Sequence, residues 1–328
     1  MFKKIELWIV GIIVLFFILL LLLTAGILRD AYLNQNQTPE FLRSNLMIVA
    51  EIPKNIYHVI SYLKGEGMNA APKLQKHKDK KRFEQFIDNE RNALLVLPRY
   101  EHSLSRSVVD IVDLNNFEVL HTYKHDIAAM NAQVTNTKKF PRLKIDQSPI
   151  RFVYQHPLLL EDGSLTAIYG PLYKIDFCSN LIWLNDEEFF HHSQMLDHEN
   201  NIWIGGMMNP LSQYVKKYAT KDFKDNSIIK INTDGKVLYN KSVTEILIEN
   251  NLIDWNFFET RYWDPIHLND IEPVFNDTKY WKKGDIFISA RHQSAIIHYR
   301  PATNKVINYI KGPFSLQHDV DVISDQEI

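Results

Sequence analysis

The sequence has a single cysteine, Cys178, among 328 residues. One cysteine cannot form an intramolecular disulfide, and it excludes a metal cluster built from cysteine ligands. A body of nearly this length must therefore be held together by the area of its hydrophobic core. Cys178 lies in the apolar run YKIDFCSNLIW. We predict that it is a small buried side chain and not a nucleophile.

The sequence also lacks a surplus of either charge, with 37 Lys and Arg against 39 Asp and Glu and a pI near 6.7. This is the composition of a globular protein, and it gives no reason to expect a nucleic-acid partner. The basic run KLQKHKDKKRFEQF is interpreted as a solvated helix face or linker, with contact to lipid headgroups or a protein partner as the alternative. No P-loop is present, so no nucleotide cofactor is expected.

Charge is absent from Leu7 to Leu28, an apolar run long enough to cross a bilayer. A cleaved signal peptide would have a shorter apolar core and a small-residue cleavage site, which TAGILRDA fits poorly. No cysteine follows, so a lipobox is excluded. We predict an uncleaved signal anchor, with Lys3 and Lys4 on the cytoplasmic side. The protein would then be a single-pass inner-membrane protein with its body in the periplasm.

What the chain has in abundance, beyond Asn92, is short runs rich in Ile, Val, Leu and Tyr between Asp, Asn and Gly turns. Such runs are typical of β-strands. One segment, VTEILIENNLIDWNFF, predicts a helix inserted between strands. We therefore predict an anchor over residues 1–30, a linker or N-terminal segment over 31–90, and an all-β domain over 91–328.

The strands recur in a pattern whose repeats open with a histidine: YQHPLLLEDGSLTAIYG, FHHSQMLDHENNIWIGG, DPIHLNDIEPV and SLQHDVDVISDQEI. Repeats of roughly 40 to 50 residues with four short strands are typical of propeller blades. The prediction is a β-propeller, with a two-sheet sandwich as the weaker alternative. The innermost strand of each blade lines a central channel. We therefore expect the four opening histidines to converge there: His156, His192, His267 and His318.

The segments HLN and SARHQ add polar groups to this expected pocket. Alternation along a strand places His267 and Asn269 on one face. Arg291 would lie beside them across the hairpin, on the same face as Ser289 and Gln293. With no carboxylate read as part of the motif, the set suits an anion, because arginine holds oxyanions through a planar donor fork. A histidine-rich zinc site is the rival interpretation, but the nearby Arg opposes it, and no metal is predicted.

At these residues the chain resembles the bacterial arylsulfotransferase (arylsulfate sulfotransferase) family, six-bladed propellers of the periplasm. The matching segments run in the family's order from about residue 90 to the end: LLVLPRY, FHHSQMLD, DPIHLNDIEPV, GDIFISARHQSAIIHYRP and GPFSLQHDVDVI. Only four to five blades are countable, and the family continues where this chain ends, ten residues after His318. We therefore expect a truncated sequence or a degenerate member with an unclosed sheet edge.

The resemblance implies transfer of a sulfuryl group from a phenolic sulfate ester to another phenol, through a sulfated histidine and without a cofactor. It makes His318 the nucleophile, with His267 and Arg291 assisting catalysis. Asn269 and His192 would bind the sulfuryl oxygens, with His191 as the alternative to its neighbour. The implied partners are an aryl sulfate donor, a phenolic acceptor and the membrane through residues 7–28. A homodimer is left open.

Two other functions compete with this enzyme. A non-catalytic propeller could bind partners at the cell envelope, since propellers host many functions. A hydrolase or lyase could reuse the same anion pocket. The imidazole, carboxamide and guanidinium groups favour catalysis, because a scaffold does not need them in its channel.

Overall fold

The structure is a computed structural model of the whole chain. It describes residues 6–33, 52–53, 55–57, 59–60, 83–104, 106–140, 143, 152–168, 170–219, 223–253, 257 and 263–328. The chain forms two compact units, Met1–Glu84 and Gln85–Ile328. Most of the basic run, up to residue 82, lies outside the described residues.

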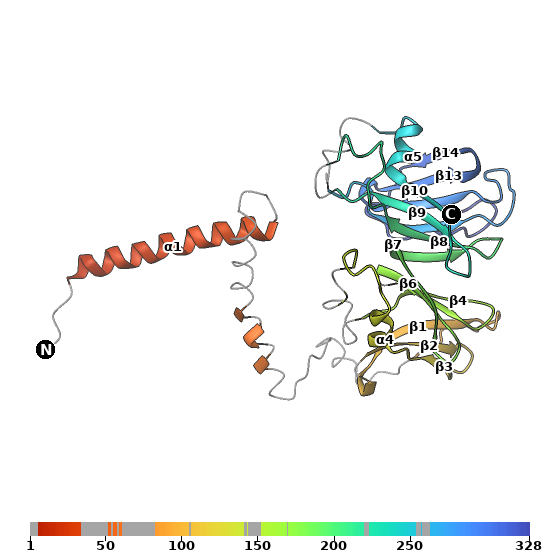
Figure 1. Cartoon of the computed structure of the whole chain (residues 1–328), viewed down its shortest axis with the longest axis horizontal. Coiled ribbons are helices and arrows are strands. Elements are labelled where there is room, and N and C mark those ends of the chain that lie inside the picture. Colours follow the sequence, from red (N-terminus) through yellow and green to blue (C-terminus); the bar gives the residue numbers. More distant parts are fainter. Residues whose placement is uncertain are drawn as a thin grey trace. The chain divides into compact units, whose positions relative to one another are not determined.

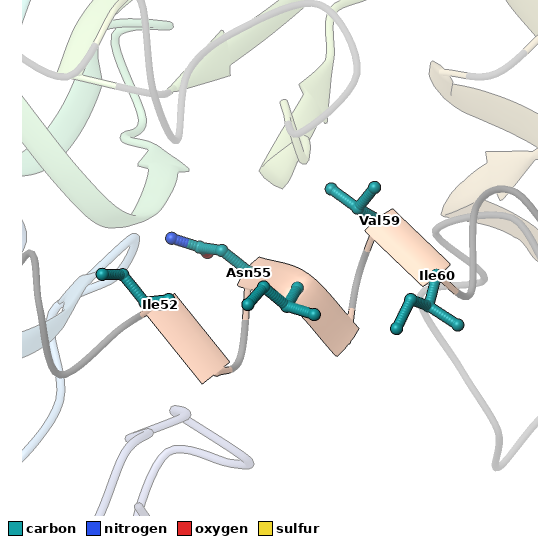
Figure 2. A pocket seen from close by; sticks show the side chains of 5 residues that line it. Ile52, Asn55, Val59 and Ile60 are labelled. Atoms are coloured by element: carbon teal, nitrogen blue, oxygen red, sulfur yellow. The ribbon is translucent and has the colours of Figure 1, made fainter.

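The first unit contains helix α1, Leu7–Leu33, which extends beyond the predicted apolar run. Within it, Trp8–Ile27 has a mean hydropathy of 3.1 and is long and apolar enough to span a membrane. A signal sequence at the N-terminus has the same length and composition. Further along, Ile52, Asn55, Ile56, Val59 and Ile60 line a hollow on a helical stretch (Figure 2).

The second unit is built from antiparallel β-sheets, as the sequence predicted, and begins with a three-stranded sheet (Figure 1). Its strands are β1 (Leu94–Glu101), β2 (Arg106–Asp113) and β3 (Val119–Tyr123), with the short turn η1 (His102–Leu104) between the first two. Helix α4 (Ile127–Ala132) follows, and Asp126 caps it by accepting a hydrogen bond from the Ala129 N–H.

A seven-stranded sheet comes next, and it consists of two four-stranded meanders that share one strand. Its strands are β4 (Gln155–Leu159), β5 (Leu165–Ile168), β6 (Gly170–Ile175), β7 (Leu181–Leu196), β8 (Ile202–Met207), β9 (Asn226–Ile231) and β10 (Val237–Ser242). The shared strand is β7, with 16 residues. Its beginning pairs with β6, and its later part, from Phe189 onward, pairs with β8.

The helix after this sheet, α5 (Val243–Glu249), confirms a helix there but is shorter than the predicted segment. The Ser242 hydroxyl caps it by accepting a hydrogen bond from the Glu245 N–H at 3.0 Å. A last four-stranded meander follows. It consists of β11 (Leu268–Pro273), β12 (Ile286–Ala290), β13 (Ala295–Arg300) and β14 (Lys305–Ile310), with short turns η3 (Arg291–Gln293) and η4 (Pro301–Thr303).

The first strands of successive meanders are neighbours in space: β1 contacts β4, β4 contacts β7, and β7 contacts β11. Hydrophobic clusters fill the space between adjacent meanders. One of these clusters packs Trp203 and Ile228, on β8 and β9, against Leu268 and Ile288, on β11 and β12. A mostly β body behind an apolar N-terminal helix is therefore confirmed, while the propeller remains a prediction.

Two strand expectations are wrong. Cys178 is exposed, because its apolar run is interrupted by a turn from Asp176 to Asn180 between β6 and β7. The Asn180 N–H closes this turn by donating to Asp176 Oδ1 at 2.7 Å. Residues 311–328, all of them described, contain no strand, although SLQHDVDVISDQEI was expected to begin one. No described strand pairs with this terminal segment.

Candidate functional site

Three of the expected histidines share an unusual backbone conformation. His156, His192 and His267 have φ of 40°, 62° and 49°. This left-handed region is uncommon for any residue other than glycine. In each case the strand register also shifts beside the histidine, in β4, β7 and β11. A bulge of this kind aims a side chain out of the normal alternation, and residues held in such conformations often cluster at functional sites.

His318 does not occupy the same position as these three residues. The left-handed residue of its segment is Leu316, with φ of 53°. Counted from that point, His318 corresponds to Asn269 in the preceding repeat and to Gln194 in the one before. The expectation that all four histidines open equivalent strands is therefore corrected for His318.

The imidazole rings gather around His192. Its ring centroid lies 5.5 Å from that of His267 and 4.8 Å from that of His191. Burial, with a smaller contribution from charges on His191, His267, His318 and His156, lowers the pKa of His192 to about 3. His192 is therefore neutral at physiological pH, with one ring N–H to donate and one nitrogen to accept.

His191 turns away from this group and into the protein. Its Nε2 lies 3.0 Å from the Gly206 carbonyl oxygen, and burial lowers its pKa to about 4. Gly205 leaves room for it, because a Cβ there would lie 3.4 Å from the ring and 3.0 Å from the His191 carbonyl oxygen. Of the two neighbours, His192 is therefore the one whose ring lies near that of His267.

Asp264 is a site residue that the sequence reasoning missed. It opens the segment DPIHLND, three residues before His267, and it is only 2% exposed. Its Oδ2 lies 2.8 Å from His267 Nδ1, and its Oδ1 accepts from Asn226 Nδ2 at 2.9 Å. Burial opposes ionisation of this carboxyl, but the hydrogen bonds from His267 and Asn226 outweigh it, and its pKa is lowered. The motif therefore does contain a carboxylate.

His292 links the same aspartate to Arg291. Its Nδ1 lies 2.6 Å from the Asp264 carbonyl oxygen, and its Nε2 lies 2.9 Å from Arg291 Nη1. Its ring centroid is 4.4 Å from that of His267. Arg291 begins the turn η3 and not a strand, so the expected shared face with Ser289 and Gln293 is wrong. Gln293 instead donates to the Pro265 carbonyl oxygen at 2.8 Å.

Asn269 connects β11 to the segment that carries His318. Its Nδ2 donates to the Gln317 carbonyl oxygen at 3.1 Å, and its side chain is buried. Gln317 Nε2 in turn donates to the Ala295 carbonyl oxygen at 2.9 Å, and the Val320 N–H donates to Asp270 Oδ2 at 3.3 Å. These bonds fix the backbone on both sides of His318, while His318 itself is exposed.

Several buried polar atoms near these groups have no hydrogen-bond partner among the described residues, and Asn269 Oδ1 and Arg291 Nε are two of them. An unmade hydrogen bond in a buried position is costly, and such groups often mark a functional site. The free guanidinium N–H suits an anionic oxygen.

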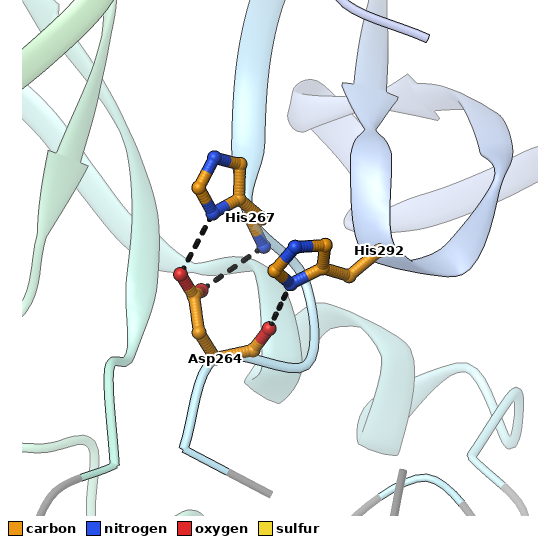
Figure 3. Close-up of side chains that lie close together, drawn as sticks. All are labelled: Asp264, His267 and His292. Carbon is orange, nitrogen blue, oxygen red and sulfur yellow. Dashed lines mark hydrogen bonds and ion pairs between the residues drawn. The ribbon is translucent and has the colours of Figure 1, made fainter. Parts of the chain in front are cut away.

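Asp264, His267 and His292 offer ligand atoms within 4.8 Å of one another, the spacing of a metal site (Figure 3). The hydrogen bonds argue against a cation. Both ring nitrogens of His292 are already engaged, by the Asp264 carbonyl oxygen and by Arg291 Nη1. A guanidinium that donates to Nε2 also places a positive charge where the metal would bind. The donor set therefore fits an anion better than a metal ion.

The chain matches a known protein family over more than half of its length. The model of the family described as Arylsulfotransferase (ASST) matches residues 158–328. The chain therefore belongs to the arylsulfotransferase family. The match includes His192, His267, Asn269, Arg291 and His318, and it begins after His156.

Other comparisons add little. No curated protein matches the chain. A crystal structure of a protein of unknown function from Bacteroides caccae is 8% identical, with a TM-score of 0.28 over 62% of this chain. This chain covers 56% of that protein's length. A catalytically inactive virginiamycin B lyase from Staphylococcus aureus with quinupristin is 8% identical, with a TM-score of 0.30 over 70% of this chain and 78% of the lyase. Similarities this low carry no conclusion about function.

Proposed function

We propose that the chain is a membrane-anchored aryl sulfotransferase that moves a sulfuryl group between phenols through a sulfated His318. The observation that supports the proposal is the His267 ring, which lies 5.5 Å from that of His192 and 4.4 Å from that of His292, the partner of Arg291. Burial keeps His192 neutral, and the Arg291 Nε–H is buried without a partner among the described residues. Together with the exposed His318, these residues offer a nucleophile and groups that can bind anionic oxygens.

In the first half of the reaction, a nitrogen of His318 forms a bond to the sulfur of the donor. The bond between sulfur and the phenolic oxygen breaks, and its electron pair leaves with that oxygen. His267 supplies the proton that makes the phenol a better leaving group, because an ordinary phenol has a pKa of about 10. The anchored backbone around His318 limits the motion of the nucleophile.

In the second half, an acceptor phenol loses its proton to His267 and attacks the sulfur. The nitrogen–sulfur bond breaks, and its electrons return to His318. Throughout, Arg291, Asn269 and His192 bind the sulfuryl oxygens. Such electrostatic clamping supplies most of the catalysis in the related transfer of phosphoryl groups. Imidazole suits this two-step route because it is both a nucleophile and a leaving group.

The decisive test is mass spectrometry of the chain after reaction with 4-nitrophenyl sulfate alone, at neutral to alkaline pH. The proposal expects sulfuryl mass on the peptide that contains His318. His318→Ala should lose both donor cleavage and transfer. If an active chain carries no such mass and His318→Ala still transfers the group, the proposed mechanism is wrong. Donor cleavage without transfer to any phenol would indicate a hydrolase instead.

The architecture and location belong to the same proposal. The body from residue 91 is a β-propeller, and the successive neighbouring meanders, with their first strands in contact, support this arrangement. Residues 1–30 anchor it and residues 31–90 connect the two. An alkaline phosphatase fusion after residue 90 should be active if the body lies in the periplasm. An inactive fusion, with a cytoplasmic reporter active in its place, would reverse the topology.

A further inference from the structure

The structure assigns Asp264 the role of a positioning residue that fixes both the proton-transferring histidine and the arginine of the anion clamp. This inference rests on the proposed function for its catalytic meaning, although its geometric content stands apart from it. Asp264 is buried and ionised, and it uses its carboxylate and its backbone carbonyl for different histidines.

The carboxylate acts on His267. Because Asp264 is ionised, its Oδ2 can only accept, so His267 Nδ1 must carry the proton of their 2.8 Å hydrogen bond. Oδ1 also accepts from the His267 backbone N–H at 3.2 Å. The Asp264 carboxylate thus holds both the ring and the backbone of His267 in place. The second ring nitrogen, Nε2, then points away from the carboxylate and is the one free to exchange a proton with a phenolic oxygen (Figure 3).

The backbone carbonyl acts on His292. It can accept only, so His292 Nδ1 donates to it, and His292 Nε2 is left as an acceptor for Arg291 Nη1. A neutral imidazole therefore holds one arm of the guanidinium. Arg291 Nε stays buried without a partner among the described residues, ready for a sulfuryl oxygen.

Three neighbours hold Asp264 itself. Asn226 Nδ2 donates to it, and Asn226 Oδ1 accepts from the Leu268 N–H at 3.2 Å, which ties the site to the start of β11. Lys224 Nζ lies 3.8 Å from Asp264 Oδ2. Besides Asp264, the groups that face His267 include His192 on β7 and His292 in η3. Asp264 therefore supplies the acceptor that fixes the His267 proton on Nδ1.

The test compares two donors in the Asp264→Asn variant. Phenyl sulfate releases a weakly acidic phenol that needs a proton, whereas 4-nitrophenyl sulfate releases an anion that is stable at neutral pH. General acid catalysis contributes about 10²–10⁴-fold. We expect Asp264→Asn to lower kcat by roughly 10²-fold with phenyl sulfate and by less than about tenfold with 4-nitrophenyl sulfate.

The fold offers a matched control. Asp285 is another buried carboxylate, 1% exposed, whose Oδ2 lies 2.8 Å from His298 Nε2 in the last meander. Asp285→Asn also breaks a buried aspartate–histidine pair, so it should lower the unfolding temperature. It should reduce the rates with the two donors by the same factor. If Asp264→Asn also reduces both rates equally, Asp264 is only structural and the inference is overturned.

A second measurement does not depend on activity. In the wild-type chain labelled with [15N]histidine, NMR should show His267 and His292 protonated on Nδ1 with a hydrogen-bonded proton, assigned by the signals that disappear in His267→Asn and His292→Asn. A neutral His267 that carries its proton on Nε2 and none on Nδ1 would overturn the inference. A chain that shows the expected tautomers but transfers no sulfuryl group would contradict the proposed function while leaving the positioning role intact.

Discussion

The histidine cluster (His191, His192, His267 and His292) and the acidic face of β11 (Asp270 and Glu272, beside the terminal segment) contain groups whose pKa burial shifts in opposite directions: it lowers that of His191 and His192 and raises that of the two carboxyls. Burial lowers the pKa of His192 to about 3, and it raises the pKa of Asp270 and of Glu272 to about 7. Charges on Asp319 add to the shift of both carboxyls. In each case the charged form is disfavoured, because a buried charge loses its hydration.

The difference lies in what a neutral group can still do. A neutral imidazole keeps a lone pair and a donor, so the histidine cluster can bind an anion and exchange protons. A protonated carboxyl has little reactivity but can lie against other carboxyls without repulsion. The acidic face thereby holds the segment that carries His318 against β11, where the Val320 N–H donates to Asp270. In the proposed mechanism the histidine cluster takes part in the reaction, whereas the acidic face attaches the terminal segment to β11.

The largest effect should come from His267→Asn. Asparagine tolerates the left-handed backbone at this position, and its amide can still donate to Asp264, but it cannot exchange a proton. We expect kcat for transfer from phenyl sulfate to fall about 10²–10⁴-fold, with the unfolding temperature nearly unchanged. A variant that folds and retains more than a tenth of the wild-type rate would remove His267 from the acid–base role.

A smaller loss is expected for Arg291→Lys. The charge is kept, but the planar fork and the contact with His292 Nε2 are lost. The kcat/KM for transfer should fall roughly 10–10²-fold, which corresponds to about 1.4–2.7 kcal/mol of activation free energy. Lys230→Arg, a change of cation on β9, is the control and should have no such effect. Equal rates for Arg291→Lys and the wild type would show that the guanidinium does not clamp the sulfuryl group.

The histidine cluster should also weaken the fold in acid. The pKa of His192 is lowered on folding, to about 3, so its contribution to stability is full above the unfolded value near 6.5 and is lost as the pH falls towards 3. We expect the free energy of unfolding to drop by about 1–3 kcal/mol between pH 6.5 and 4. His192→Asn, which cannot titrate, should show a shallower decrease in urea titrations. Identical slopes in the two proteins would contradict the buried neutral form.

The acidic face should show the opposite sign and the smallest effect. The pKa of Glu272 is raised on folding, to about 7, so its contribution is full below the unfolded value near 4.5 and is lost as the pH rises through 7. Glu272→Gln should therefore stabilise the protein at pH 8 by about 1–2 kcal/mol and have no effect at pH 4. The same chemical unfolding at both pH values measures this, and a gain at pH 4 alone would reverse the assignment.

Much of the fold could be predicted because buried strands require apolar residues to recur regularly along the sequence. Strands such as β8 and β12 are apolar and β-branched, and the turns between strands carry Asp, Asn and Gly at the expected places. The geometry of the candidate site was harder to predict, because it depends on places where this regular pattern is broken. The bulges beside His192 and His267 break the alternation of side chains, so neither their direction nor the offset of His318 follows from spacing.

Two site residues were hidden for local reasons. Asp264 is part of the segment DPIHLNDIEPV, but a contact between residues three apart across an irregular loop leaves no periodic signal in the sequence. His292 was overlooked because SARHQ was interpreted as a strand, whereas Arg291 to Gln293 form a tight turn. Ser294 completes that turn with its backbone in the left-handed region, at φ of 47°. Unlike glycine, serine in a sequence does not predict this conformation.

The shared strand β7 has a consequence for how the body comes apart. Its beginning is the last strand of one meander and its later part is the first strand of the next. Neither meander can lose β7 without breaking the hydrogen bonds of the other, so the seven strands from β4 to β10 form one cooperative block. Amide hydrogens along β5 and β9 should then exchange with solvent through one common opening. The free energy of that opening should have the same dependence on denaturant concentration for both strands. The meander from β11 to β14, which shares no strand with this block, is free to open separately and could carry His318 with it.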